Sequence, residues 1–154
     1  MKLYLVQHGE AKPEAEDPER SLSVKGEDET RKISIAGKKL NLRPSKVYHS
    51  GKLRATQTAK ILAEGLNIPA SSVLFAQGLN PNDDVRPWAK RISEETEDLM
   101  LVGHLPFLEK LVSLLLCGNE DLRIVLFRYS GIVCLEKKED KKWAIRWVLL
   151  PEMV

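Results

Sequence analysis

The chain has 154 residues, with 24 lysines and arginines against 22 aspartates and glutamates, so its formal net charge is +2. Hydrophobic residues make up 43% and charged residues 30%, which is typical of a globular domain and excludes a disordered or membrane-embedded chain. The length predicts one domain over residues 1–154. The even charge balance gives no reason to expect nucleic-acid or membrane binding.

Two features indicate the compartment. The first methionine is followed by a short apolar run without a signal-peptide pattern, and no stretch approaches the roughly 18 apolar residues of a membrane span. Cys117 and Cys134 have no metal-ligand spacing and do not make a disulfide framework. We therefore expect a cytoplasmic protein, and we expect it to be a monomer.

The first half of the chain alternates between apolar runs and helical periodicity. It predicts a buried strand over residues 2–6, a polar surface loop over 10–21, a helix over 23–40, a strand over 45–50 and a helix over 52–66.

The alternation continues in the second half and then changes character. It predicts a strand over residues 71–76, a turn over 79–84, a helix over 85–95, a strand over 97–104 and a helix over 106–118. Residues 122–150 instead predict strands joined by turns, with a hairpin at 138–142. We therefore predict an α/β fold of three layers, α/β/α, whose mostly parallel central sheet has an antiparallel C-terminal part.

Two histidines stand in equivalent places, each where a predicted buried strand ends. His8 follows the first strand, and His104 ends the fourth strand just before a helix. Ligands of open α/β sheets bind outside the carboxyl ends of the strands, so both imidazoles can face one pocket. A lone histidine is more often structural, but the agreement of two separate elements favours a functional pair.

The second predicted strand ends in a segment suited to an anion. Arg54 lies at the start of the following helix, where backbone N–H groups favour anions and a guanidinium offers a planar fork to phosphate oxygens. Alone, it is most simply a surface arginine; combined with the two histidines, it indicates an anion site. Ser50, at the strand end, either adds a hydrogen bond or has a local capping role.

Three segments around these residues resemble the three signature blocks of the histidine phosphatase superfamily, which includes the phosphoglycerate mutases. They are LVQHGEA (5–11), HSGKLRATQTA (49–59) and LVGHLP (101–106), in the family's order and spanning most of the chain. The small size and the segments ERSLSVKGEDE (19–29) and GLNPNDD (78–84) are similar to the SixA-type phosphohistidine phosphatases. The resemblance implies a phosphoglycerate mutase-like fold.

The same resemblance implies the roles of the site residues. His8 would attack phosphorus and become transiently phosphorylated, while Arg54 and His104 would stabilise charge on the phosphoryl oxygens. A tight turn at Gly9 would let backbone amides approach the phosphate. No metal or other cofactor is implied. We expect the substrate to be phosphohistidine on a signalling protein of the histidine phosphotransfer type, because imidazole leaves easily and a site without insertions admits a protein surface.

Two positions depart from the family pattern. Gln7 stands where the family nearly always has a phosphate-clamping arginine, and an amide lacks the charge and the bidentate fork. The loss predicts phosphate binding weaker by about one to two orders of magnitude, unless Lys52 or Lys25 compensates. The proton-donating glutamate of larger relatives is also missing; Asp83 or Asp84 could replace it, although turns attract aspartates in any case.

These departures leave two alternatives open: a degenerate phosphatase that binds a phosphoprotein without turnover, and a small-molecule phosphomonoesterase that uses a different proton donor. A mutase is less favoured, because no insertion would enclose a sugar phosphate. Of the remaining candidates, His49, Trp143 and Trp147 are expected to be structural. Trp88 is a possible stacking residue, and Glu10 is a possible contact to a partner's imidazole.

Overall fold

The computed structural model describes residues 1–154, and its centre is one sheet of six strands in the order β3-β2-β4-β1-β5-β6. The strands are β1 Lys2–Gln7, β2 Lys46–His49, β3 Val73–Phe75, β4 Leu99–Gly103, β5 Ile132–Lys137 and β6 Trp143–Leu149. β1 to β4 pair in parallel, whereas β5 is antiparallel to both β1 and β6. The prediction of a mostly parallel sheet with an antiparallel C-terminal part is confirmed.

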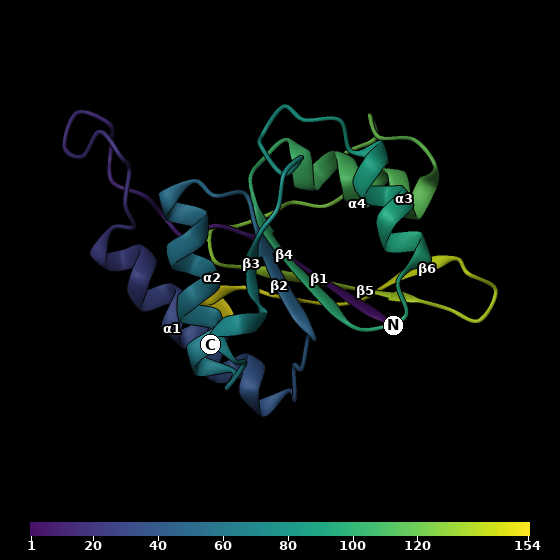
Figure 1. Cartoon of the computed structure of the whole chain (residues 1–154), viewed down its shortest axis with the longest axis horizontal. Helices are drawn as coiled ribbons and strands as arrows, with labels where there is room; N and C mark the ends of the chain where they lie inside the picture. The colour runs from purple at the N-terminus through teal and green to yellow at the C-terminus, as the bar shows by residue number, and fades with distance from the viewer.

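Helices cover both faces of this sheet, as Figure 1 shows. On one face lie α1 (Val24–Lys39) and α2 (Leu53–Gly65), and on the other lie α3 (Arg86–Glu94) and α4 (Phe107–Cys117). Short 3₁₀ turns, η1 (Ala70–Ser72) and η2 (Pro151–Met153), precede β3 and follow β6. The three-layer α/β/α prediction is therefore correct, and the helix limits agree with the periodicity to within one or two residues.

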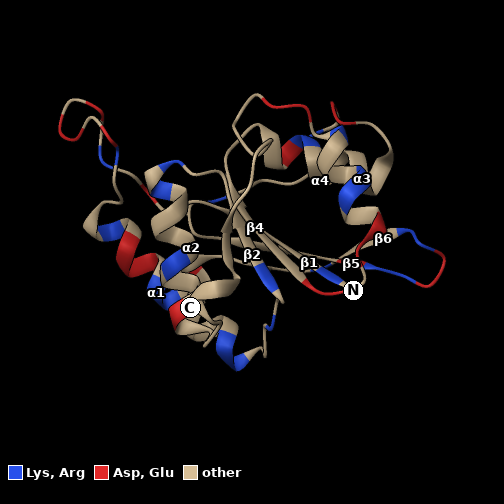
Figure 2. Ribbon diagram, viewed as in Figure 1, with Lys and Arg blue, Asp and Glu red and all other residues tan.

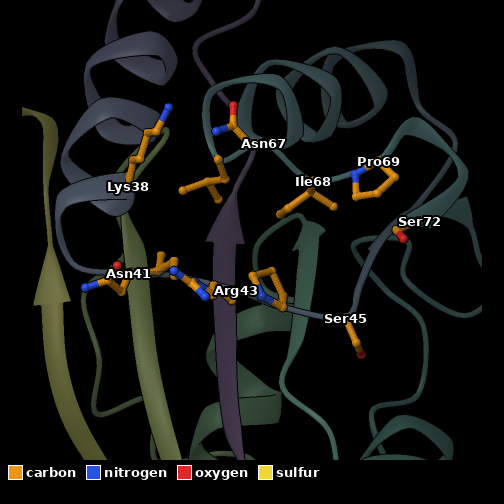
Figure 3. Close-up of a pocket in the computed structure, with 11 residues that line it drawn as sticks. Lys38, Asn41, Arg43, Ser45, Asn67, Ile68, Pro69 and Ser72 are labelled. Atoms are coloured by element: carbon orange, nitrogen blue, oxygen red, sulfur yellow. The ribbon is translucent and has the colours of Figure 1, made fainter.

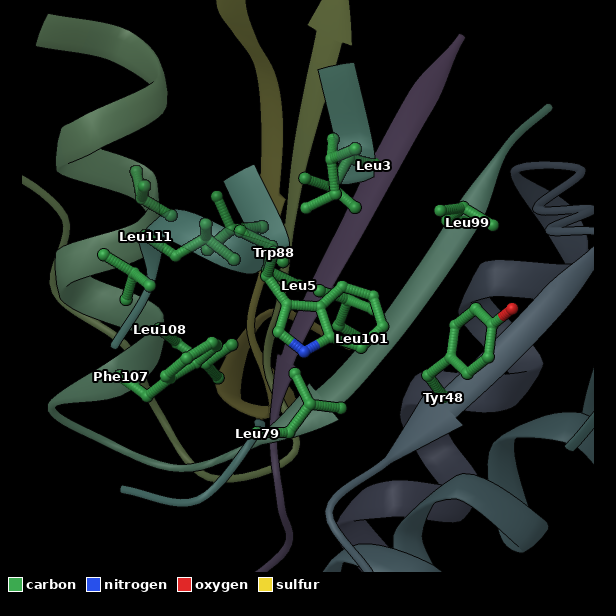
Figure 4. Packing of buried hydrophobic residues seen from close by; sticks show 14 of the residues in the cluster. Leu3, Leu5, Tyr48, Leu79, Trp88, Leu99, Leu101, Phe107, Leu108 and Leu111 are labelled. Atoms are coloured by element: carbon green, nitrogen blue, oxygen red, sulfur yellow. The ribbon is translucent and has the colours of Figure 1, made fainter. Parts of the chain in front are cut away.

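The strand side chains alternate between two hydrophobic cores, as the period of a strand requires. Leu3 and Leu5 pack in the core under α3 and α4, while Tyr4 and Val6 pack in the core under α1 and α2. Trp88 of α3 lies among the leucines of the first core (Figure 4), and its indole N–H donates to the Gln77 carbonyl oxygen at 3.0 Å. Trp88 is therefore part of the packing, and its indole is not a free stacking surface.

The prediction of strands throughout residues 122–150 is wrong in its first part. Only β5 and β6 form there; residues 122–129 return from the end of α4 to the start of β5 without pairing. Their inward side chains, Val125 and Phe127, are absorbed by the core under α3 and α4. β5 already pairs with the edge of β1 beside these residues, so they do not add another strand there. Their alternation of apolar side chains reflects packing in the core only.

Charge is spread over the molecule. Figure 2 shows lysines and arginines interspersed with aspartates and glutamates over the helices and loops. None of the helices combines the length and the apolarity that a membrane crossing requires.

Candidate functional site

The carboxyl ends of β1, β2 and β4 meet at one edge of the sheet, because these strands are parallel and in close register. There the His8 backbone N–H donates to the Gly103 carbonyl oxygen at 3.0 Å. The rings of His8 and His104 lie with their centroids 5.0 Å apart, and both residues are buried. The structure thus brings together the two histidines that the sequence places at strand ends.

The hydrogen bonds of His8 define its tautomer. Nδ1 lies 2.7 Å from the Gly9 carbonyl oxygen, which can only accept, so Nδ1 carries the proton. Nε2 is left with its lone pair and accepts from Arg54 Nε at 3.3 Å. A nucleophile for phosphorus must present such an unprotonated nitrogen to the anion site, and His8 does so.

His104 is held by a side chain from the neighbouring strand end. Its Nε2 lies 2.6 Å from the Ser50 hydroxyl oxygen, while its buried Nδ1 has no hydrogen-bond partner. Ser50 therefore connects the end of β2 to that of β4. It contributes less as a cap, because the Lys52 N–H reaches its hydroxyl only at 3.4 Å.

Both imidazoles are neutral at physiological pH. Burial lowers the pKa of His8 to about 4, and the charges of Arg54 and Arg20 act in the same direction against the Gly9 carbonyl, which raises it. Burial, with His8 and Arg54 beside it, lowers the pKa of His104 to about 3. The site therefore carries its positive charge on the cations around the histidines.

We expect the two histidines to take up protons only in strong acid. A lowered imidazole pKa keeps the neutral base until the pH falls to that value, so His8 should titrate near pH 4 and His104 near pH 3. The chain has three histidines, and NMR of ¹⁵N-labelled imidazoles with single-histidine variants resolves each titration. A His8 titration near pH 6.5 would contradict this environment.

Gln7 lies beside this pair and is largely buried, with 8% of its surface exposed. Its side-chain Oε1 has no hydrogen-bond partner, while its backbone carbonyl accepts from the Ser130 N–H at 3.0 Å. The position that carries an arginine in the resembled family is thus a neutral amide in this chain.

Arg20 is a cation near the site that sequence reasoning missed. Its charge contributes to lowering the pKa of His8, Arg54 and His104, while its Nε donates to the Lys12 carbonyl oxygen at 3.3 Å within the loop before α1. A bridge between Ala11 and Leu22 closes this loop. The sequence signal that could have indicated Arg20 is the segment ERSLSVKGEDE, which contains this arginine.

The two lysines considered as compensating cations have different surroundings. The charge of Lys52 contributes to lowering the pKa of His104, so this lysine acts on the site. Lys25 instead lies 3.6 Å from a Glu10 carboxylate oxygen and 4.0 Å from one of Glu29. Glu10 also accepts a hydrogen bond from the Ser23 hydroxyl at 2.8 Å, so its carboxylate holds the start of α1.

The expected role of the Gly9 backbone needs correction. Its N–H donates to the Thr58 hydroxyl oxygen at 2.9 Å and is not free for an anion. The glycine is required for close packing instead: a Cβ there would lie 2.9 Å from Thr30 Oγ1 and 3.1 Å from the Gly26 carbonyl oxygen. Gly9 therefore supports the site by letting α1 and α2 approach the end of β1.

Tyr129 is a second residue that the sequence did not reveal. Its ring centroid lies 5.5 Å from that of His8, and 42% of its surface is exposed. It reaches the site because β5 is antiparallel to β1, so the residues before β5 lie at the edge where β1 ends. The two rings are tilted by 41° to one another, so Tyr129 packs beside the His8 ring at the site.

A cleft of about 670 Å³ extends from Ser50 toward the start of α3, with Phe75 and Trp88 among its walls. Asp83 and Asp84 also line it, but each has a local role. Asp83 Oδ2 accepts from the Asn80 N–H at 2.8 Å. Hydrogen bonds from Arg86 hold the pKa of Asp84 below its usual range, so Asp84 is ionised and is a poor proton donor.

Two other features lie outside the site. His49 Nδ1 accepts from the Gly51 N–H and lies within hydrogen-bonding distance of the Thr56 hydroxyl, both at 3.2 Å, which makes it a support for the start of α2. A cavity of about 600 Å³, shown in Figure 3, lies where β2 and β3 begin, at the opposite edge of the sheet. The structure contains no cluster of three histidines, cysteines or carboxylates that could hold a metal ion.

We compared the chain with known proteins and solved structures. No family model matches the chain. The chain is 27% identical over 158 residues to the phosphohistidine phosphatase SixA of Escherichia coli (strain K12), covering 98% of this chain and 94% of that protein. It is 33% identical over 142 residues to an uncharacterized protein of Picosynechococcus sp. (strain ATCC 27264 / PCC 7002 / PR-6), covering 88% of this chain and 84% of that one.

Among solved structures, the protein histidine phosphatase SixA complexed with tungstate superposes with a TM-score of 0.86 at 26% identity, over 99% of both chains. The similarity therefore covers the whole sheet, all helices and the edge where His8, Arg54 and His104 meet. The chain belongs to the histidine phosphatase superfamily and is SixA-like.

Proposed function

We propose that this protein is a phosphatase that works through a phosphohistidine intermediate on His8 and removes phosphate from phosphohistidine on a signalling protein. The observation that carries the proposal is the orientation of His8: its Nδ1 proton is held by Gly9, and its Nε2 lone pair faces Arg54. The name and the fold of the SixA relatives support the same reaction.

The reaction divides into two displacements at phosphorus. In the first, the His8 Nε2 lone pair forms a bond to phosphorus while the bond to the leaving nitrogen breaks, and that nitrogen keeps the electron pair. In the second, a water oxygen bonds to phosphorus, the P–Nε2 bond breaks, and its electron pair returns to Nε2. The proton of the water leaves with the phosphate product or passes to solvent.

The positive charges around His8 are suited to binding the transferred phosphoryl group. Arg54, whose Nε donates to His8 Nε2, and Arg20, whose charge acts on both of these residues, would offset the charge on the equatorial oxygens. His104 is neutral, so it acts as a hydrogen-bonding group held in place by Ser50. No step requires a carboxylic acid.

The poor proton donors in the cleft favour a nitrogen leaving group. An alkoxide leaves slowly without general-acid help, which is typically worth about 10²–10⁴-fold. An imidazole leaves far more easily, so an ionised Asp84 is no obstacle. We infer that P–N bonds are the preferred substrates and alkyl phosphate esters the poor ones.

Inorganic phosphate release tests this proposal. The purified chain should hydrolyse a histidine-phosphorylated phosphotransfer domain and phosphoramidate, with kcat/KM at least about 100-fold above that for glycerol phosphate. Equal or faster release from glycerol phosphate would instead indicate a phosphomonoesterase. Binding of the phosphorylated domain without any release would indicate a phosphoprotein-binding module.

A further inference from the structure

The segment 122–129, between α4 and β5, has two different sides. Val125 and Phe127 pack in the core under α3 and α4. Ile124 and Leu126, which alternate with them, are 51% and 73% exposed. The segment is anchored on its inner side and presents two large apolar side chains to solvent.

The backbone N–H groups of this segment are also unpaired. None of the N–H groups from Leu122 to Tyr129 donates a hydrogen bond to another group of the chain. Exposed apolar side chains beside unpaired backbone groups are typical of surfaces that bind another protein chain.

The segment ends at the catalytic edge. The ring of Tyr129 packs against His8, and the following Ser130 N–H donates to the Gln7 carbonyl oxygen at 3.0 Å. At roughly 3.6 Å per residue, Leu126 lies within about 11 Å of Tyr129 and Ile124 within about 18 Å. A protein interface covers about 800 Å² on each partner, which corresponds to a disc of roughly 16 Å radius. A protein that docks over His8 and Tyr129 therefore extends to the neighbourhood of Leu126, with Ile124 at or beyond its rim, whereas a small phosphorylated molecule does not.

The opposite flank of the site has a comparable feature. Phe75, at the end of β3, is 60% exposed and lines the cleft that begins at Ser50. Arg54, whose Nε donates to His8 Nε2 at 3.3 Å, lies at the site between these two apolar flanks. The arrangement matches a partner that carries an anionic phosphoryl group in the middle of an apolar surface.

We propose that Ile124, Leu126 and Tyr129 form a docking surface for the protein that carries the phosphohistidine, and that its occupant is an apolar surface next to the phosphorylated side chain. The inference rests on the proposed function and specifies which surface of this chain holds its protein substrate. It also explains why a chain without insertions over its site leaves apolar side chains exposed there.

Two surface variants, Ile124→Asp and Leu126→Asp, test the docking surface. Both side chains face solvent, so the folded state should tolerate the changes. With a histidine-phosphorylated phosphotransfer domain, Leu126→Asp should raise KM about tenfold or more at unchanged kcat, and Ile124→Asp, farther from Tyr129, should raise it by a smaller factor. Hydrolysis of phosphoramidate, which is too small to contact either residue, should not change. Ile35→Asp and Leu40→Asp, at residues of the same types that are 57% and 53% exposed on α1, are the matched controls.

The outcomes separate the docking surface from the reaction. An unchanged KM for the phosphorylated domain, or an equal loss with phosphoramidate, would overturn the docking surface and leave the phosphatase proposal intact. Absence of phosphate release from both substrates by the unaltered chain would overturn the reaction and, with it, the docking proposal. A concentration-dependent dimer that Leu126→Asp dissociates would assign the surface to a second copy of the chain and overturn the proposal as well.

Discussion

Replacement of His8 by alanine is expected to lower kcat by about 10³-fold or more, because the variant lacks the nitrogen that bonds to phosphorus. Arg54, Arg20 and His104 remain, so the variant should still bind the phosphorylated substrate. Phosphate release and equilibrium binding, measured on the same preparation, separate the two effects. If the variant retains most of its turnover, His8 is not the nucleophile.

The intermediate offers a direct second test. Phosphohistidine survives in alkali, so quenching the reaction in base and digesting the chain should reveal a phosphorylated peptide that contains His8. His49→Ala is the matched control, since His49 also ends a strand but is bound to Gly51 and Thr56. It should keep its phosphorylated His8 peptide. Phosphate on a His49 or His104 peptide would reassign the nucleophile.

Much of the site was predictable because its central residues follow buried strands. The apolar runs before His8 and His104 identify central strands, and parallel strands deliver their final residues to one edge. The juxtaposition of the two rings therefore follows from local patterns plus one topological rule. Arg54 was accessible in the same way, since it lies at the start of the helix after β2.

Arg20 and Tyr129 could not be found in this way, because long-range packing decides their positions. Arg20 lies in a polar loop that is folded by its own hydrogen bonds, such as that from the Lys12 N–H to the Ser21 carbonyl oxygen at 2.8 Å. Tyr129 reaches His8 only because β5 pairs antiparallel with β1. Neither the hydrogen bonds of the loop nor the antiparallel pairing of β5 produces a periodic pattern in the sequence. The same reason explains the wrong strand at 122–129: alternation reports burial, and it does not report whether a pairing edge is free.

We propose that Arg20 helps a site with Gln7 to hold a phosphoryl group. Gln7 brings no charge to the edge, and its Oε1 is buried without a partner. Arg20 approaches from the loop and acts on the same three groups, His8, Arg54 and His104. We therefore expect Arg20 to supply part of the charge that an arginine at position 7 would provide, with Lys52 acting nearer to His104.

A cycle of substitutions measures this compensation. A charge-assisted hydrogen bond is worth about 1.5–3 kcal/mol, so Arg20→Gln should lower kcat/KM by about 10- to 100-fold, and Gln7→Arg should raise it by a similar factor. When Gln7→Arg is already present, Arg20→Gln should lower kcat/KM by a clearly smaller factor, because the two cations contact the same phosphoryl oxygens. The affinity of each variant for inorganic phosphate, measured as competitive inhibition, should change in the same order as its kcat/KM.

Lys25→Gln is the control for this cycle, because Lys25 is a nearby cation whose charge is directed to Glu10 and Glu29. It should leave kcat/KM and phosphate inhibition unchanged, since removing a mostly exposed ion pair alters little beyond the surface. If Arg20→Gln behaves like Lys25→Gln, Arg20 does not contact the phosphoryl group and Gln7 leaves the site with Arg54 as its principal clamp. If instead Gln7→Arg gains nothing while Arg20→Gln loses activity, the loop arginine already supplies all the charge that the transferred group can use.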